Sequence, residues 1–185
     1  MKATGIVRRI DDLGRVVIPK EIRRTMRIRE GDPLEIYTNR EGEVIFKKYS
    51  PIGELNSFAA QYAETLYRAC NLEILICDRD AVIAIAGVSK KEYLERPLSH
   101  DLEKIMEGRG IYRYNGDEEY IYPVNSPSSH YVSTAMPIIT EGGDVIGCVV
   151  ALSLIGKERQ GDPSSDVESK LITTAAVFLG KQMEA

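Results

Sequence analysis

Hydrophobic and polar positions follow two different patterns along this chain. In residues 1–50, called the head below, short runs rich in β-branched residues are separated by turn residues. These runs predict strands at 4–10, 15–18, 34–38 and 44–49. Pro19, a residue suited to the first turn of a helix, precedes a short helix predicted over 20–27. Such elements bury little apolar surface, and the head has neither paired cysteines nor metal-ligand spacing, so we expect it to fold only as a dimer.

After a linker at 51–55, apolar residues recur at helical and strand spacings through residues 56–185, called the tail below. The pattern predicts a domain of strands that begins and ends with a helix. Ser165 followed by Glu168 predicts a capping box at the start of the closing helix. The elements predicted between the two helices are strands at 72–77, 81–86, 120–124, 131–139 and 145–154 and a helix at 98–106.

The same two parts of the chain differ in net charge. The head holds 12 Lys and Arg against 8 Asp and Glu, a net of +4, whereas the whole chain has 24 against 28. Residues 51–185 therefore carry 12 against 20, a net of −8. A basic module joined to an acidic one suggests two tasks, and the positive charge of the head predicts a polyanionic partner, double-stranded DNA.

The basic residues of the head are also arranged in a regular pattern. On a helix, positions 20, 23, 24 and 27 share one face, and an arginine can grip a phosphate or a guanine edge with two bonds. From charge alone, a solvated face partly neutralised by Asp11, Asp12 and Glu21 is an equally good interpretation. The candidate set is Arg8, Arg9, Arg15, Lys20, Arg23, Arg24 and Arg27.

The tail offers little chemistry. Cys77 and Cys148 lie in apolar runs typical of core thiols, and with Cys70 they make an odd count without metal-ligand spacing. His130 follows serines but has no acidic residue nearby to orient it as a triad would need. Residues 78–80 predict a turn rather than a cation loop, and the tyrosines of 112–131 favour packing on a sheet. We therefore expect no catalysis, metal or cofactor.

Targeting signals are equally sparse. No apolar segment follows the N-terminus, and the longest apolar run, at 145–155, is too short to cross a bilayer. The expected location is the cytoplasm, at the nucleoid, with no membrane partner.

The segment LGRVVIPKEIRR, residues 13–24, resembles the core motif of the AbrB-like transition-state regulators. The resemblance implies a swapped-hairpin β-barrel in which two chains interleave and bind DNA. The DNA-contacting arginines of that family match Arg8, Arg15, Arg23 and Arg24, and Arg9 stands where relatives carry a basic residue. Lys20 is a candidate only through its place on the helix face.

The tail resembles a GAF domain in the order of its elements. The resemblance implies a role in assembly, a possible small-molecule ligand that the sequence does not identify, and outer helices that bundle between chains into a tetramer. The residues expected at that interface are Leu55, Phe58, Tyr62, Leu66, Leu171 and Phe178. An AbrB-like head joined to a GAF-like tail resembles transcription regulators, activators or repressors, of sporulation genes in spore-forming bacteria.

The expected fold class is thus α+β, with a swapped-hairpin barrel followed by a GAF-like α/β domain. One alternative is an antitoxin, because some antitoxins share the swapped-hairpin fold, although their tails are typically short and partly disordered. The other is a thiol-dependent oxidoreductase, because some GAF-fold proteins reduce methionine sulfoxide. The apolar setting of two of the three cysteines disfavours the thiolate that such an enzyme needs.

Overall fold

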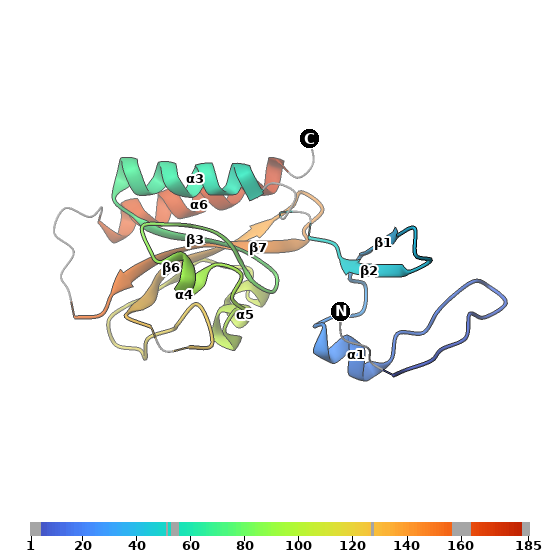
Figure 1. Ribbon diagram of the computed structural model, residues 1–185. Helices are drawn as coiled ribbons and strands as arrows, with labels where there is room; N and C mark the ends of the chain where they lie inside the picture. The colour runs from blue at the N-terminus through green and yellow to red at the C-terminus, as the bar shows by residue number, and fades with distance from the viewer. Residues whose placement is uncertain (1–4, 51, 53–55, 127, 157–163, 183–185) are drawn as a thin grey trace. The chain divides into compact units, whose positions relative to one another are not determined.

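The computed structural model describes residues 5–50, 52, 56–126, 128–156 and 164–182 (Figure 1). The chain divides into two compact units, Met1–Tyr49 and Ser50–Ala185. Most of the predicted linker lies outside the described residues. Ile52, which is described, is fully buried in the core of the second unit.

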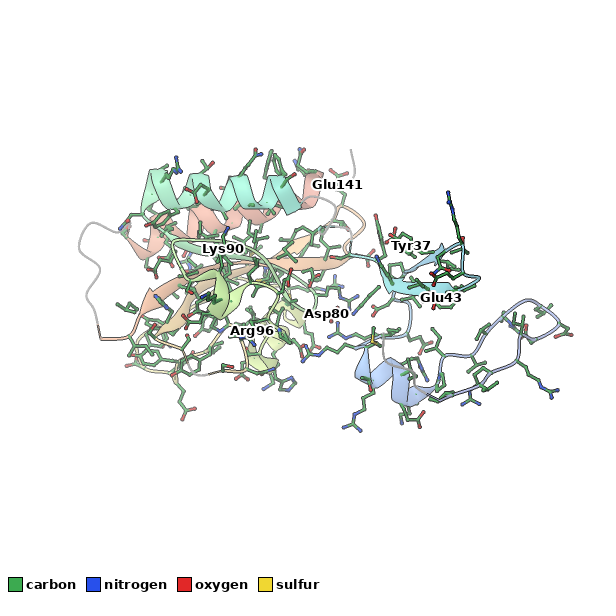
Figure 2. The ribbon with its side chains drawn as sticks, viewed as in Figure 1. Tyr37, Glu43, Asp80, Lys90, Arg96 and Glu141 are labelled. Carbon is green, nitrogen blue, oxygen red and sulfur yellow. The ribbon has the colours of Figure 1, made fainter. Side chains whose placement is uncertain are left out.

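The head contains one helix, α1 (Lys20–Thr25), and one hairpin of strands β1 (Leu34–Thr38) and β2 (Val44–Lys48). The two strands pair antiparallel, with Ile36 opposite Phe46. Asn39 shapes the connecting turn, because its Oδ1 accepts hydrogen bonds from the N–H groups of Glu41 and Glu43, at 3.1 and 2.9 Å. Figure 2 shows Tyr37 and Glu43 on this hairpin. The hairpin predicted from the sequence is therefore confirmed, with its second strand one residue shorter.

The strands predicted at 4–10 and 15–18 are wrong for the described part of the single chain. Residues 5–10 and 15–18 are not in strands, and residue 4 lies outside the described residues. A strand forms only where a neighbour supplies hydrogen-bond partners, and no described strand of this chain pairs with these segments. Their apolar side chains stay in water: Val7 is 89% exposed and Val17 is 70% exposed. No described residue of the head is buried.

The helix predicted over 20–27 ends earlier, at Thr25. Met26 caps α1, and Arg27 has a φ of 51°, in the left-handed region that stops a helix. The N–H of Ile28 then donates to the carbonyl of Arg23, at 2.7 Å. Arg27 consequently leaves the helical face on which the sequence placed it.

The tail is an antiparallel sheet of five described strands with helices on both faces (Figure 1). Strand order is β4-β3-β7-β6-β5. Helices α3 (Asn56–Cys70) and α6 (Ser165–Gln182) cover one face, and α4 (Lys90–Tyr93) and α5 (His100–Glu107) lie on the other. The strands are β3 (Glu73–Asp78), β4 (Val82–Ala86), β5 (Tyr112–Arg113), β6 (His130–Ile139) and β7 (Val145–Leu154). This confirms the α/β tail that the sequence predicted, between an opening and a closing helix.

Alternation along the central strands divides the core into two layers. Ile74 and Ile76 face α3 and α6, whereas Leu75 and Cys77 face the α5 side of the sheet. Cys148, directly opposite Cys77 on β7, belongs to the same layer. Burial raises the pKa of both thiols, so they remain protonated at neutral pH. Their predicted place in the core is confirmed.

Two local predictions in the tail are wrong. Residues 120–124 form no strand beyond an isolated bridge between Val124 and Leu98, because Pro123 lacks an N–H and β5 occupies the neighbouring edge of β6. The helix predicted at 98–106 is confirmed as α5, although it starts at His100, where the Ser99 Oγ accepts a hydrogen bond from the N–H of Leu102, at 3.1 Å. Helix α4 was not predicted.

The second wrong prediction is the capping box. Glu168 does not turn back to the start of α6; its side chain enters the domain, and the residue is only 3% exposed. There its carboxylate accepts hydrogen bonds from the Ser133 Oγ, at 2.6 Å, and the Thr134 Oγ1, at 2.7 Å. The Glu168 carboxylate therefore accepts hydrogen bonds from hydroxyls on β6 and does not form the capping box.

Candidate nucleic-acid interface

The turn at 11–15 holds one of the candidate arginines in place. The Asp11 Oδ1 accepts hydrogen bonds from the N–H groups of Leu13 and Arg15, at 3.0 and 2.7 Å. Its Oδ2 accepts from the Arg15 Nε, at 2.9 Å. Gly14, with a φ of 76°, provides the left-handed residue that closes this turn. Arg15 is thus oriented at its Nε while its side chain stays 70% exposed.

Helix α1 carries three further cations. Pro19 precedes it with an extended ψ of 150°, and the Pro19 carbonyl accepts from the N–H of Arg23, at 3.0 Å. Lys20, Arg23 and Arg24 are all exposed, one helical turn apart, so they lie on one face of the helix as predicted. Ile22 is half-buried on another face.

Apart from Arg27, the candidates occupy two places in the head. Arg8 and Arg9 precede the 11–15 turn in an exposed, extended segment, and Arg15 follows that turn. Figure 1 shows this turn at the tip of a long loop that projects away from α1. Within one chain the structure therefore gathers the three cations of α1 on one helix but leaves Arg8, Arg9 and Arg15 apart from them.

The tail brings together a polar cluster that the sequence did not predict. The Glu73 Oε2 lies 3.3 Å from the His130 Nε2, so the expectation that this histidine lacks an acidic partner is wrong. The hydroxyls of Tyr93 and Ser129 each lie 3.1 Å from the His130 Nδ1. The imidazole thereby joins β6 to β3 and to α4. Glu73 and His130 lie far apart in the sequence, and no spacing pattern indicates their contact.

Other tail features agree with their sequence interpretation. The Asp78 Oδ1 accepts from the N–H groups of Asp80 and Ala81, at 2.8 and 2.7 Å, which confirms a turn at 78–80. The rings of Tyr114, Tyr120 and Tyr131 pack on one another, with centroids 4.5 to 5.3 Å apart. These contacts account for the three rings without a ligand.

The outer face of α3 and α6 presents an aromatic cluster. Phe178 on α6 lies 5.8 Å from Phe58 and 5.6 Å from Tyr62, measured between ring centroids, and is 37% exposed. Of the other residues predicted at an oligomer interface, Leu66 is only 6% exposed, in the core of its own chain. Leu171 is half-buried against that core, and Leu55 lies outside the described residues.

Two kinds of site are absent from the described part of the chain. It contains no group of three or more His, Cys, Asp or Glu side chains arranged to hold a metal ion. None of its helices is both long enough and apolar enough to cross a membrane.

Comparison with known proteins assigns both parts. Residues 54–184 match the family model of the C-terminal domain of stage V sporulation protein T, described as a transcription factor. Residues 7–53 match the model of the MazE bacterial antitoxin, which covers most of the head and ends in the linker. The antitoxin likeness therefore concerns the fold of the head, whereas the tail matches a transcription factor.

Some relatives match only the N-terminal part of the chain. The chain is 63% identical over 51 residues to the transition state regulatory protein AbrB of Bacillus subtilis, which covers 28% of this chain and 52% of the relative. A solution structure of the N-terminal DNA recognition domain of that regulator is 61% identical over 28% of this chain and 94% of its own, with a TM-score of 0.25.

One relative matches from end to end. Stage V sporulation protein T of Bacillus subtilis is 52% identical over 184 residues, which covers 100% of this chain and 99% of the relative. The chain therefore belongs to the stage V sporulation protein T family, transcription factors of sporulation with an AbrB-like N-terminal domain.

Proposed function

We propose that the head binds double-stranded DNA through exposed cations of the 8–15 segment and of α1. The observation that carries the proposal is the pair of positioned cationic groups: Arg15, oriented by Asp11, and the face of α1. Exposed arginines on a basic module of an otherwise acidic chain suit the phosphate backbone and the guanine edge. The residues assigned to this surface are Arg8, Arg9, Arg15, Lys20, Arg23 and Arg24.

The binding unit is an interleaved dimer. Exposed apolar residues of the segments before and after the 11–15 turn support this, among them Val7 and Val17, because a second copy would cover them. Strand pairing with that copy would also satisfy the backbone of residues 5–10 and 15–18. Two copies would supply both cationic groups twice. The surface that contacts one DNA duplex would then be larger than a single chain provides.

The test compares DNA binding by full-length variants over a range of salt concentrations. Arg23→Ala and Arg24→Ala should each weaken binding, by about 1–3 kcal/mol where a base edge is lost, or lower the salt slope by about one unit where a phosphate contact is lost. Arg40→Ala removes an equally exposed arginine from the β1–β2 turn and should bind like the wild type. Wild-type affinity in both helix variants would reject the assignment.

We infer that the tail assembles head dimers and relays a signal, and that it catalyses no reaction. Phe58, Tyr62 and Phe178 leave part of an aromatic cluster in water, which a helix pair from another chain would cover to give a tetramer. Burial raises the pKa of the Cys77 and Cys148 thiols, which opposes a thiolate enzyme. With DNA as its partner, the protein would act in the cytoplasm, at the nucleoid.

A further inference from the structure

One ion pair of the head is shielded from water although no described residue of the head is buried as a whole. The Lys48 Nζ on β2 lies 3.1 Å from the Asp32 Oδ2. The carboxylate side chain is only 2% exposed and the lysine side chain 21%. The N–H of Arg29 donates to the same carboxylate oxygen, at 2.8 Å. A carboxylate so shielded depends on these partners, because an ionised group is costly to bury alone.

The same lysine reaches the end of α1. Its Nζ donates to the carbonyl of Arg27, at 2.8 Å. Arg27 follows the cap of α1 in the left-handed conformation, which a residue with a side chain seldom adopts without support. The carbonyls at a helix C-terminus lack helical partners, and a cation is favourable there. Lys48 therefore bonds both to the segment leaving α1 and to the loop before β1.

Helix α1 needs such external support. It has six residues, too few to be stable alone. The N–H of Ile28 donates to the carbonyl of Arg23, so the chain folds back directly behind one of the proposed DNA-contacting residues. The direction in which the helix presents its arginines thus depends on how its C-terminal end is held.

We propose that Lys48 and Asp32 are positioning residues for DNA recognition: they fix α1 to the β1–β2 hairpin so that Arg23 and Arg24 face the duplex, and neither touches DNA. This inference rests on the DNA-binding function proposed above. From its positive charge alone, Lys48 would be expected to contact a phosphate. Its proposed role is instead to position α1.

The decisive experiment measures the DNA affinity of Lys48→Met in the full-length protein, alone and combined with Arg23→Ala and Arg24→Ala. Lys47→Met is the matched control: the neighbouring lysine is exposed, and its Nζ lies 4.6 Å from the ring centre of Tyr37, labelled in Figure 2. We expect Lys48→Met to lose about tenfold in affinity in the wild-type background, but little further affinity where Arg23 and Arg24 are already Ala, and Lys47→Met to retain more affinity. An equal loss in both backgrounds would indicate that Lys48 contacts DNA independently and would overturn the proposal.

A second measurement needs no DNA and remains informative if Lys48→Met folds poorly. Hydrogen exchange at residues 20–28 should be faster in Asp32→Asn, which keeps an acceptor for the N–H of Arg29 but loses the ion pair. Lys48→Arg, which can still reach both oxygens, should exchange at about the wild-type rate and bind DNA normally. Wild-type exchange in Asp32→Asn would contradict the proposed support of α1.

The controls also separate the two proposals. If Arg23→Ala and Arg24→Ala both bind DNA like the wild type, the proposed DNA surface fails. If Arg23→Ala is impaired while Lys48→Met and Asp32→Asn bind normally, the surface stands and the positioning role fails.

Discussion

At the scale of single residues, Asp11 determines how Arg15 is presented. The ion pair between them is exposed, 70% on the arginine and 36% on the aspartate, and such pairs add little stability. Its effect is instead geometric, because one carboxylate accepts from the backbone and the side chain of the same arginine. An arginine restrained before it meets DNA loses less conformational entropy on binding.

This contact has a consequence for pH. Hydrogen bonds from the Arg15 N–H and then from its guanidinium lower the pKa of Asp11 below its ordinary value. A lowered pKa means that the contact favours folding above the ordinary pKa and is lost as pH falls through the lowered one. In an NMR titration, Arg15→Ala should raise the pKa of Asp11 partway towards about 3.9, since the backbone bond remains. Arg40→Ala should leave that pKa unchanged; an unaltered pKa in Arg15→Ala would disprove the contact.

At the scale of elements, Glu168 fixes α6 to β6. Its carboxylate accepts hydrogen bonds from the Ser133 and Thr134 hydroxyls, and the Glu168 residue is almost fully buried. Backbone contact is also close, since a Cβ at Gly180 would lie only 2.3 Å from the Ile139 carbonyl oxygen. The closing helix is therefore seated by one buried polar contact and one glycine as well as by apolar packing.

Replacing Glu168 with Ala should destabilise the tail by about 1–3 kcal/mol, because the buried Thr134 hydroxyl loses its acceptor. The half-buried Ser133 hydroxyl would keep the Ala151 carbonyl as an acceptor, at 3.0 Å. Urea unfolding of the full-length protein measures this. The control is Asp166→Ala in the first turn of the same helix, where the side chain is 84% exposed and its pair with Arg113 spans 3.3 Å. That variant should unfold close to the wild type; equal losses in both variants would argue against the buried contact.

At the scale of the whole molecule, the interleaved head dimer that we propose depends on protein concentration. If strands form at residues 5–10 and 15–18 only when two chains interleave, their amides should become more protected from hydrogen exchange as protein concentration rises. Mass spectrometry of the full chain, diluted stepwise, measures this directly. Fast exchange in these segments at every concentration, in a protein that sediments as a dimer or larger, would exclude interleaved strands.

The aromatic cluster of α3 and α6 yields a further prediction at this scale. Phe58→Glu and Phe178→Glu place a charge in the proposed bundle and should reduce a tetramer to dimers that still bind one DNA site. Binding to paired sites should fall much more, because the second head dimer no longer benefits from high effective concentration. Ala60→Glu, about half a helical turn from Phe58 and exposed, is the matched control. Sedimentation that shows tetramers in all three variants would reject the bundle.

How much of this could be predicted from the sequence depends on how local the determining interactions are. The hairpin of β1 and β2, the long strands β6 and β7 and the closing helix follow from turn residues and apolar spacing within each segment. The segment at 13–24 indicated the AbrB-like family of the head, and Pro19 marked the start of α1. The buried cysteines also followed from their apolar neighbours.

Contacts between distant residues were decided only by the tertiary structure. Lys48 with Asp32, Glu73 with His130, and Glu168 with the hydroxyls of β6 lie in different elements, and no periodicity relates their positions. Glu168 shows the reason most clearly: its local pattern predicted a helix cap, but packing of α6 on the sheet offered its carboxylate buried donors instead. The sequence by itself determined most of the helices, turns and strands and where positive charge collects, because these depend on near neighbours. Tertiary structure decided which polar groups meet, because that requires whole elements to be brought together.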